Sequence, residues 1–202
     1  MGPVSILLLA TAAAGGQWEL VHPGPDAIVE KRANGDGFYE IRVTKVSDVS
    51  AAAIADAYWN ERETTLKTQK KYVVLSRTAD EKVAYLQLHL PIVKDRDYTI
   101  RIARYFDAVS GLFQFSGRCV SDTGPPPNDD HVRVTACTAQ LTLEPAGDGR
   151  TVVTYVAFAN PEGRIPKWVV NAVAAKAVIE VVDKLIELGR DRASQALSSG
   201  GR

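Results

Sequence analysis

The sequence predicts an α+β domain in which an antiparallel sheet of about seven strands or more packs against one short and one long helix. Between residues 27 and 160, segments that alternate apolar and polar side chains are separated by turn signals such as Asn34-Gly35-Asp36-Gly37. After Pro166 this alternation gives way to a helical period that continues to Gly189. A sheet of this size, if strongly curved, can wrap around the long helix and leave space between them.

The strands are predicted from a period of two, and the short helix from an Ala-rich segment without Gly or Pro over 51–59. In the strand over 82–90, for example, Ala84, Leu86 and Leu88 share one face. The predicted strands cover residues 27–32, 38–46, 72–78, 82–90, 96–107, 112–120, 132–143 and 151–160.

The long helix is predicted over 166–189, because proline is tolerated in a first turn and glycine commonly follows a last one. A charged stripe should face water, and the opposite stripe, centred on Ala174 and Val178, should face the sheet. Its small residues fit two interpretations: close packing on the sheet, or a void kept open for a ligand. Asn171, near this stripe, is either a polar ligand contact or an amide satisfied by backbone or water. The small and polar residues 193–202 predict a disordered tail.

The 202 residues suit a single domain with a sizeable core, predicted over 17–192. Apolar residues make up 46% and charged residues 24%, which is typical of a globular protein and argues against a membrane-spanning bundle. Lys and Arg together equal Asp and Glu, so no net charge attracts nucleic acid, and no nucleic-acid partner is expected. The spacing of Cys and His predicts no metal site, and we expect no cofactor.

The N-terminal segment differs from the rest of the chain. Residues 4–11 are almost wholly apolar and run into small residues, which predicts a signal peptide over 1–16, although no Lys or Arg precedes the apolar run. The protein is therefore expected to be periplasmic or secreted, and cytoplasmic if the segment is not a signal. In an oxidising compartment Cys119 and Cys137 can form a disulfide; otherwise they are small apolar wall residues.

Four motifs, in the right order and spacing over about residues 18–190, resemble the StAR-related lipid-transfer (START) family. They match its opening strand, the Trp-Asn after its first internal helix, its proline loop before Arg-Asp-aromatic, and the start of its C-terminal lid helix. In this sequence they are Trp18-Glu19-Leu20 with residues 28–32, Trp59-Asn60, Leu90-Pro91-Ile92-Val93-Lys94-Asp95-Arg96-Asp97-Tyr98, and Gly163-Arg164-Ile165-Pro166-Lys167-Trp168-Val169-Val170-Asn171.

The resemblance implies a helix-grip fold whose tunnel holds one lipid or other hydrophobic small molecule, closed by the C-terminal helix, in a protein expected to be a monomer. Pro91, Arg96 and Asp97 are expected to hold a loop and a strand start, although Arg96 and Asp97 could instead contact the ligand. Ile165 and Trp168 are expected to form a gate or a transient membrane contact, and the alternative for Trp168 is core packing against the loop. The expected wall of the tunnel consists of Leu86, Leu88, Tyr98, Ile100, Ile102, Phe113, Phe115, Leu141, Val170, Asn171, Ala174, Val178 and Val181.

The sequence departs from the family at one place in the tunnel. Sterol-type members carry an inward basic residue six positions after the arginine of Arg-Asp, paired with an acid on the preceding strand. These positions fall at Ile102 and Val83. The ion pair is therefore missing, the tunnel is expected to be drier, and the choice among sterol, phospholipid and sphingolipid stays open.

Polyketide aromatase/cyclases share the grip architecture, so an enzyme of that kind acting on a hydrophobic substrate is the alternative. An enzyme needs a positioned acid, base or nucleophile in its pocket. The sequence holds no nucleophile elbow, and the inward candidates Tyr98, Tyr39 and Tyr155 are of a type found more often as core residues. We therefore expect a non-enzymatic lipid-binding protein without catalytic residues.

Overall fold

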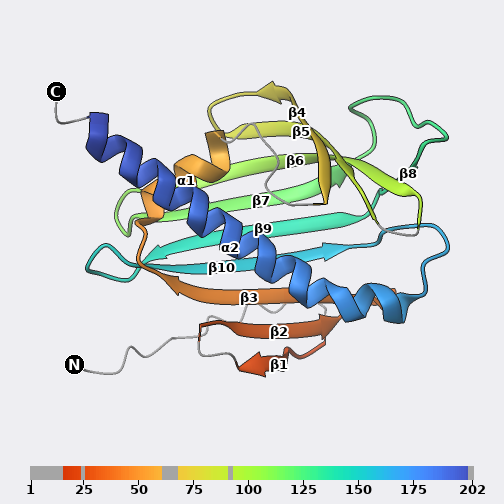
Figure 1. Ribbon diagram of the computed structural model, residues 1–202, viewed down its shortest axis with the longest axis horizontal. Coiled ribbons are helices and arrows are strands. Elements are labelled where there is room, and N and C mark those ends of the chain that lie inside the picture. Colours follow the sequence, from red (N-terminus) through yellow and green to blue (C-terminus); the bar gives the residue numbers. More distant parts are fainter. Residues whose placement is uncertain (1–15, 24–25, 61–67, 91–92, 200–202) are drawn as a thin grey trace.

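The computed structural model describes residues 16–23, 26–60, 68–90 and 93–199, which form one sheet and two helices. In chain order the elements are β1 (Glu19–Pro23), β2 (Ile28–Ala33), β3 (Tyr39–Ser47), α1 (Ala51–Asn60), β4 (Gln69–Arg77), β5 (Glu81–Leu88), β6 (Asp95–Asp107), β7 (Leu112–Val120), β8 (His131–Arg133), β9 (Cys137–Pro145), β10 (Thr151–Ala159) and α2 (Lys167–Ser199). The long helix α2 crosses the sheet diagonally, and α1 lies beside its C-terminal half (Figure 1).

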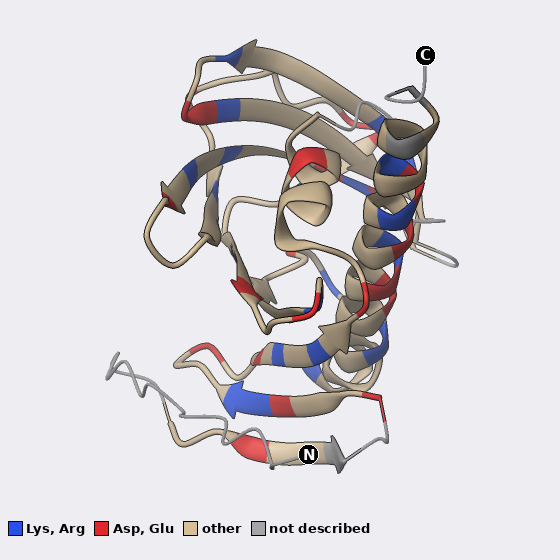
Figure 2. Cartoon of the chain, turned by 90° about the vertical axis from the view of Figure 1, so that its left-hand side faces the viewer, with Lys and Arg blue, Asp and Glu red and all other residues tan. Residues whose placement is uncertain are grey.

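The strands lie in the order β1-β2-β3-β10-β9-β7-β6-β5-β4, and β8 is added beside β6. Every pairing is antiparallel except that of β8 with β6. The sheet curves around α1, and α2 runs along its open side with charged residues turned outward (Figure 2). This architecture confirms the predicted α+β class and helix-grip fold, with ten strands in the described residues.

The single strand predicted over 132–143 is wrong, because the chain breaks between β8 and β9. The N–H of Val134, between β8 and β9, donates to the carbonyl oxygen of Asp97 in β6 at 2.9 Å and so does not pair with β7. The short strand β8 pairs in parallel with the start of β6, where Arg133 reaches the carboxylate of Asp97. A charged pair across two strands therefore sets this boundary, and apolar alternation does not reveal it.

The helix α2 is longer than predicted, because it passes through Gly189 and continues to Ser199. A Cβ atom on Gly189 would lie 2.8 Å from Cγ1 and 3.0 Å from Cα of Ile54 in α1. This glycine therefore permits a close helix–helix contact and does not end the helix. The predicted disordered tail from residue 193 is wrong as far as Ser199. Residues 200–202 and, for the predicted signal peptide, residues 1–15 lie outside the described residues.

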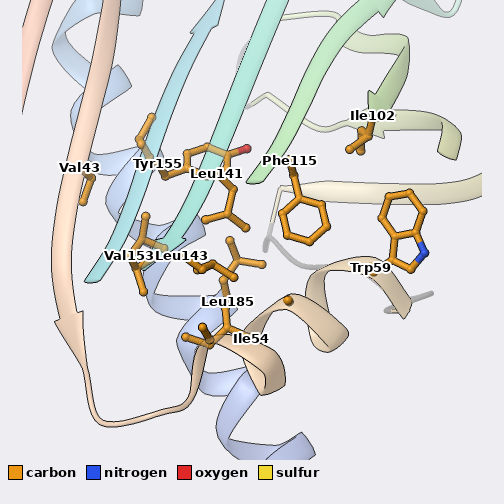
Figure 3. Close-up of a cluster of buried hydrophobic side chains, with 14 of the residues drawn as sticks. Val43, Ile54, Trp59, Ile102, Phe115, Leu141, Leu143, Val153, Tyr155 and Leu185 are labelled. Atoms are coloured by element: carbon orange, nitrogen blue, oxygen red, sulfur yellow. The ribbon is translucent and has the colours of Figure 1, made fainter. Parts of the chain in front are cut away.

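The hydrophobic core is most completely filled where α2 meets α1. Ile54 of α1, Leu185 of α2 and the sheet residues Leu143 and Val153 have almost no exposed surface. Figure 3 shows these side chains in one cluster, with Phe115 beside them. Large apolar groups from both helices and the sheet thus stabilise this end of the grip. None of the helices in the described ranges is long and apolar enough to cross a membrane.

Candidate ligand-binding site

The first turns of α2 are fixed to the turn between β2 and β3. The side chain of Asn171 accepts a hydrogen bond from the Tyr39 N–H at 3.1 Å and donates one to the Gly37 carbonyl at 3.3 Å. Lys167 donates to the carbonyl oxygen of Asp36 in the same turn. Backbone groups thus engage the Asn171 amide, which is one of its two predicted roles. Its contact with a ligand stays a prediction.

The predicted tunnel wall divides into two groups by exposure. Those buried in the core are Leu86, Ile100, Ile102, Phe115, Leu141 and Val178. Those that keep part of their surface exposed are Leu88, Tyr98, Phe113, Val170, Asn171, Ala174 and Val181. On the inner face of β9 and β10, the paired residues Ala139 and Ala157 are also half-buried. Small, incompletely covered side chains therefore occur on both the helix and the sheet, although their contact with a ligand stays a prediction.

Four tyrosines, Tyr58, Tyr72, Tyr98 and Tyr155, lie on the inner side of the sheet. Tyr72 and Tyr98 flank Leu86 across β4, β5 and β6, so all three share one face. Burial raises the pKa of Tyr72 and Tyr155 to about 12. Burial, together with the neighbouring tyrosines, also raises the pKa of Tyr58 and Tyr98. No side-chain hydrogen bond within the described residues involves any of the four hydroxyls.

Gln69, at the start of β4, adds an unpaired amide to the same face. It pairs with Leu88 across the β4–β5 ladder and is buried, and its Nε2 has no hydrogen-bond partner within the described ranges. An unpaired buried donor costs roughly 1–3 kcal/mol. We call Gln69 and the four tyrosines the polar cluster. It holds hydrogen-bonding capacity that the described part of the chain does not use.

The inner side of the sheet also carries a charge that was not predicted from the sequence. The register of β5 and β6 pairs Ile102 with Lys82, not Val83, so Lys82 faces inward and is only 1% exposed. Its ammonium donates to the carbonyl oxygens of Tyr58 and Trp59, each at 3.1 Å, at the C-terminal end of α1. Burial lowers the pKa of Lys82 to about 8. A buried cation therefore holds α1 against the sheet at this position.

Sequence reasoning missed Tyr58, Tyr72, Gln69 and Lys82 as residues of this site. The sequence does contain a signal for Lys82. This lysine lies four residues before Leu86 in a strand of period two, so both side chains face the same side of the sheet. The signal for β4 is weaker, since its ladder with β5 has two irregularities in register, after Gln69 and again near the strand's end. A shift of one residue reverses the face on which each side chain lies.

Arg96 and Asp97 point to opposite faces of β6 and have separate partners, as predicted. Arg96 donates to the carbonyl oxygens of Pro161 at 3.1 Å and Glu162 at 3.2 Å, and so ties β6 to the segment before α2. Asp97 accepts two hydrogen bonds from Arg133, at 2.9 and 2.8 Å. Burial alone would raise the pKa of Asp97, but these hydrogen bonds outweigh it and hold the pKa below its usual value. Both residues thus fix the strand start.

Both residues of the predicted gate are described, whereas Pro91 of the predicted structural loop and the residue after it lie outside the described residues. Ile165, just before α2, is half-buried. Trp168 in its first turn is 74% exposed, and Val173 further along is 57% exposed. Two large apolar side chains are therefore open to solvent at the N-terminal end of α2.

Cys119 and Cys137 form a disulfide, as the sequence allowed. The bridge joins the end of β7 to the start of β9 and so closes the loop that carries β8. Cys119 pairs with Ile100 across the β6–β7 ladder, and Cys137 packs against the hydrophobic core. The bridge therefore belongs to the same face as the predicted tunnel wall.

The inner face offers hydrogen bonding and apolar contact. The two histidines whose side chains are described lie elsewhere: His89 contacts Asp95 at 2.8 Å, and His131 contacts Asn128 at 3.1 Å. Within the described ranges, no three His, Cys, Asp or Glu side chains are grouped so that they could hold a metal ion. The chemistry on this face is thus that of tyrosine, glutamine and one lysine.

Solved structures with the same architecture come from bacteria and human. The chain is similar to a STAR-related lipid transfer protein from Xanthomonas axonopodis, with 22% identity and a TM-score of 0.76 over 86% of this chain and 98% of that one. Human STARD10 shows 20% identity and a TM-score of 0.78 over 90% and 76%. The Zhui aromatase/cyclase from Streptomyces sp. R1128 shows 13% identity and a TM-score of 0.53 over 76% and 94%. At these identities the likeness concerns the fold alone.

No curated protein matches the sequence. The model of the START domain matches residues 6–192, so it begins within the segment predicted as a signal peptide and ends within α2. The match covers nearly the whole chain, including the Arg-Asp strand and the C-terminal helix. The chain therefore belongs to the START domain family, whose members bind hydrophobic ligands.

Proposed function

We propose that this protein binds a single lipid-like molecule between the first half of α2 and the sheet, and carries or senses it without changing it chemically. The observation that carries this proposal is the polar cluster, in which the buried Gln69 amide nitrogen has no partner among the described residues and no described hydrogen bond engages the four tyrosine hydroxyls. A lipid combines one polar group with a long apolar part. The polar cluster suits the first, and the incompletely covered apolar wall suits the second.

Apolar contact supplies most of the expected affinity. Each methylene removed from water contributes about 0.8 kcal/mol, so a long chain needs few polar contacts to bind tightly. The polar cluster then selects the orientation and the head group of the ligand. Because burial raises the pKa of all four tyrosines, they stay uncharged at neutral pH and suit an uncharged hydroxyl, carbonyl or ester group.

The same groups favour binding without turnover. Tyr72 and Tyr155, with a pKa of about 12, are poorly matched to proton transfer at neutral pH. Lys82 has a pKa of about 8, but its ammonium donates to the end of α1. The alternative is a cyclase-like enzyme acting on a hydrophobic substrate, which the shared fold of the Zhui aromatase/cyclase supports. Such an enzyme would reveal itself by changing the mass or the ring structure of an added substrate.

The proposal includes a periplasmic or secreted location and transient contact with a membrane. The Cys119–Cys137 disulfide supports an oxidising compartment, in line with the expected signal peptide. The exposed Trp168 supports insertion into a membrane interface, where aromatic side chains are favoured. We propose a monomer, because the sheet and both helices of one chain surround the polar cluster.

Native mass spectrometry of the protein from its own host, followed by solvent extraction, tests the proposal. We expect one lipid per chain. The variant Ala174→Phe adds a ring on the inner side of α2 and should abolish this adduct. The matched control Ala177→Phe adds the same ring on the exposed side and should retain it. A protein that stays empty after incubation with host lipids, or equal binding by both variants, would contradict the proposed site.

A further inference from the structure

A pocket of about 480 Å³ lies between α1 and the hairpin of β6 and β7. Beyond Ala103, β6 has no partner in β5, so the end of this hairpin extends past its neighbour. The pocket combines aromatic rings with charged groups and is separate from the polar cluster. The residues that line it include Asp56, Trp59, Arg104, Phe106, Phe113 and Phe115.

One aromatic ring contacts both this pocket and the polar cluster. Phe115 lines the pocket and is only 2% exposed. The same ring meets Tyr58 of the polar cluster edge-on, with ring centroids 4.8 Å apart. Phe115 also pairs across the sheet with Arg104 on one side and Leu141 on the other. Figure 3 shows the Phe115 ring between Leu141 and Trp59.

The wall beside Phe115 is held more firmly than Phe115 itself. Three cations lie over the Trp59 ring, Arg77 at 5.8 Å, Lys82 at 5.2 Å and Arg104 at 4.7 Å from its centroid. Arg77 and Lys82 also donate hydrogen bonds to the Trp59 carbonyl. Phe115 is held by ring contacts and apolar packing. Of these two pocket-lining rings, Phe115 is therefore the one that is held without a hydrogen bond or a charged partner.

We infer that Phe115 restricts the ligand to a small, uncharged head group. This inference rests on the proposed function, in which the head group lies at the polar cluster. A larger head group would have to occupy the space that the Phe115 ring fills. With that ring removed, the head group could extend into the pocket and meet Arg104 and Asp56. Phe115 is thus a specificity-determining residue, and the ligand class is an amphiphile whose head is no larger than a hydroxyl, carbonyl or ester.

The test compares two probes with the same hydrocarbon chain, hexadecanol and palmitoyl lysophosphatidylcholine. The wild-type protein should bind hexadecanol more tightly by about tenfold or more. Phe115→Ala should remove most of that preference by gaining affinity for lysophosphatidylcholine, and Phe115→Leu, a milder change in the core, should remove part of it. Ala52 is exposed and lines the pocket. Ala52→Trp should therefore restore the preference in the Phe115→Ala background and leave wild-type binding unchanged.

The possible results of this test either support the inference or overturn it. Equal binding of both probes by the wild type, or an unaltered preference in a folded Phe115→Leu protein, would overturn the inference. Failure of Ala52→Trp to restore the preference would also overturn it, because the larger head group would then lie elsewhere. If the wild type binds host lipids but neither probe, the inference is wrong while the proposed function stands. If it binds no lipid at all, both are wrong.

Discussion

The two halves of α2 cover the same sheet in different ways. In the C-terminal half, Leu185 is almost completely buried, and Gly189 lets the helix approach Ile54 of α1 closely. In the N-terminal half, inward residues such as Ala174 remain half-exposed, and polar contacts hold the helix to the β2–β3 turn. One amphipathic helix can thus combine a filled core that stabilises the fold with an incompletely filled wall, which is where we propose that the ligand binds.

The largest expected effect is the difference in stability lost when an aliphatic side chain in each half is truncated to alanine. Leu185→Ala should lower the free energy of unfolding by about 3 kcal/mol, because it leaves a cavity in a filled core. Val170→Ala in the other half should lower it by less than about 1 kcal/mol, since the side chain is already half-exposed and alanine favours the helix. Urea unfolding measures both. Equal losses would show that the two halves are packed alike and would remove the basis of the comparison.

Lys82 is buried beneath the end of α1 and should make the stability depend on pH. Folding lowers its pKa from 10.5 to about 8, so the unfolded chain binds more protons than the folded chain between these values. The free energy of unfolding should therefore rise with pH, by about 2 kcal/mol between about pH 7 and 9.5. Lys82→Met should abolish this rise.

Urea unfolding of both proteins across this range checks the prediction. The range ends below pH 10 because the buried tyrosines act in the opposite direction: their pKa is raised by folding, so their ionisation favours the unfolded chain at higher pH. Parallel pH profiles for the wild type and Lys82→Met would show that Lys82 keeps an ordinary pKa in the folded protein.

The difference between the halves is only partly visible in the sequence. Periodicity predicted the order of the main strands and both helices, because burial of one face imposes a period of two or of 3.6 on the chain. The same periodicity runs through both halves of α2, so it does not distinguish filled from incomplete packing. That difference depends on which residues of the sheet lie opposite, such as Ala139 and Ala157, and on the close approach at Gly189.

The errors in the prediction of the site have the same origin. The family pattern located Ile102 correctly but placed Val83 opposite it, and the actual partner is Lys82. A difference of one residue in register therefore replaces the expected apolar Val83 opposite Ile102 with the buried cation Lys82. Likewise, Gly189 resembles a helix end in sequence, and only the position of Ile54 gives it another role. Contacts between residues distant in the chain set both features.

The smallest effect on stability is expected from Trp168→Ala. This variant also tests which end of the molecule contacts a membrane. This side chain is 74% exposed, so its removal should change the free energy of unfolding by less than about 0.5 kcal/mol. If the N-terminal end of α2 contacts the membrane, the Trp168 ring is buried in the lipid interface when the protein is bound. Its removal should then weaken binding to phosphatidylcholine vesicles about tenfold. Tyr105→Ala is the matched control, because Tyr105 is 59% exposed at the end of β6 beside α1. Vesicle co-sedimentation of the two variants and the wild type gives the answer: a greater loss with Tyr105→Ala would move the membrane contact to the filled end of the grip.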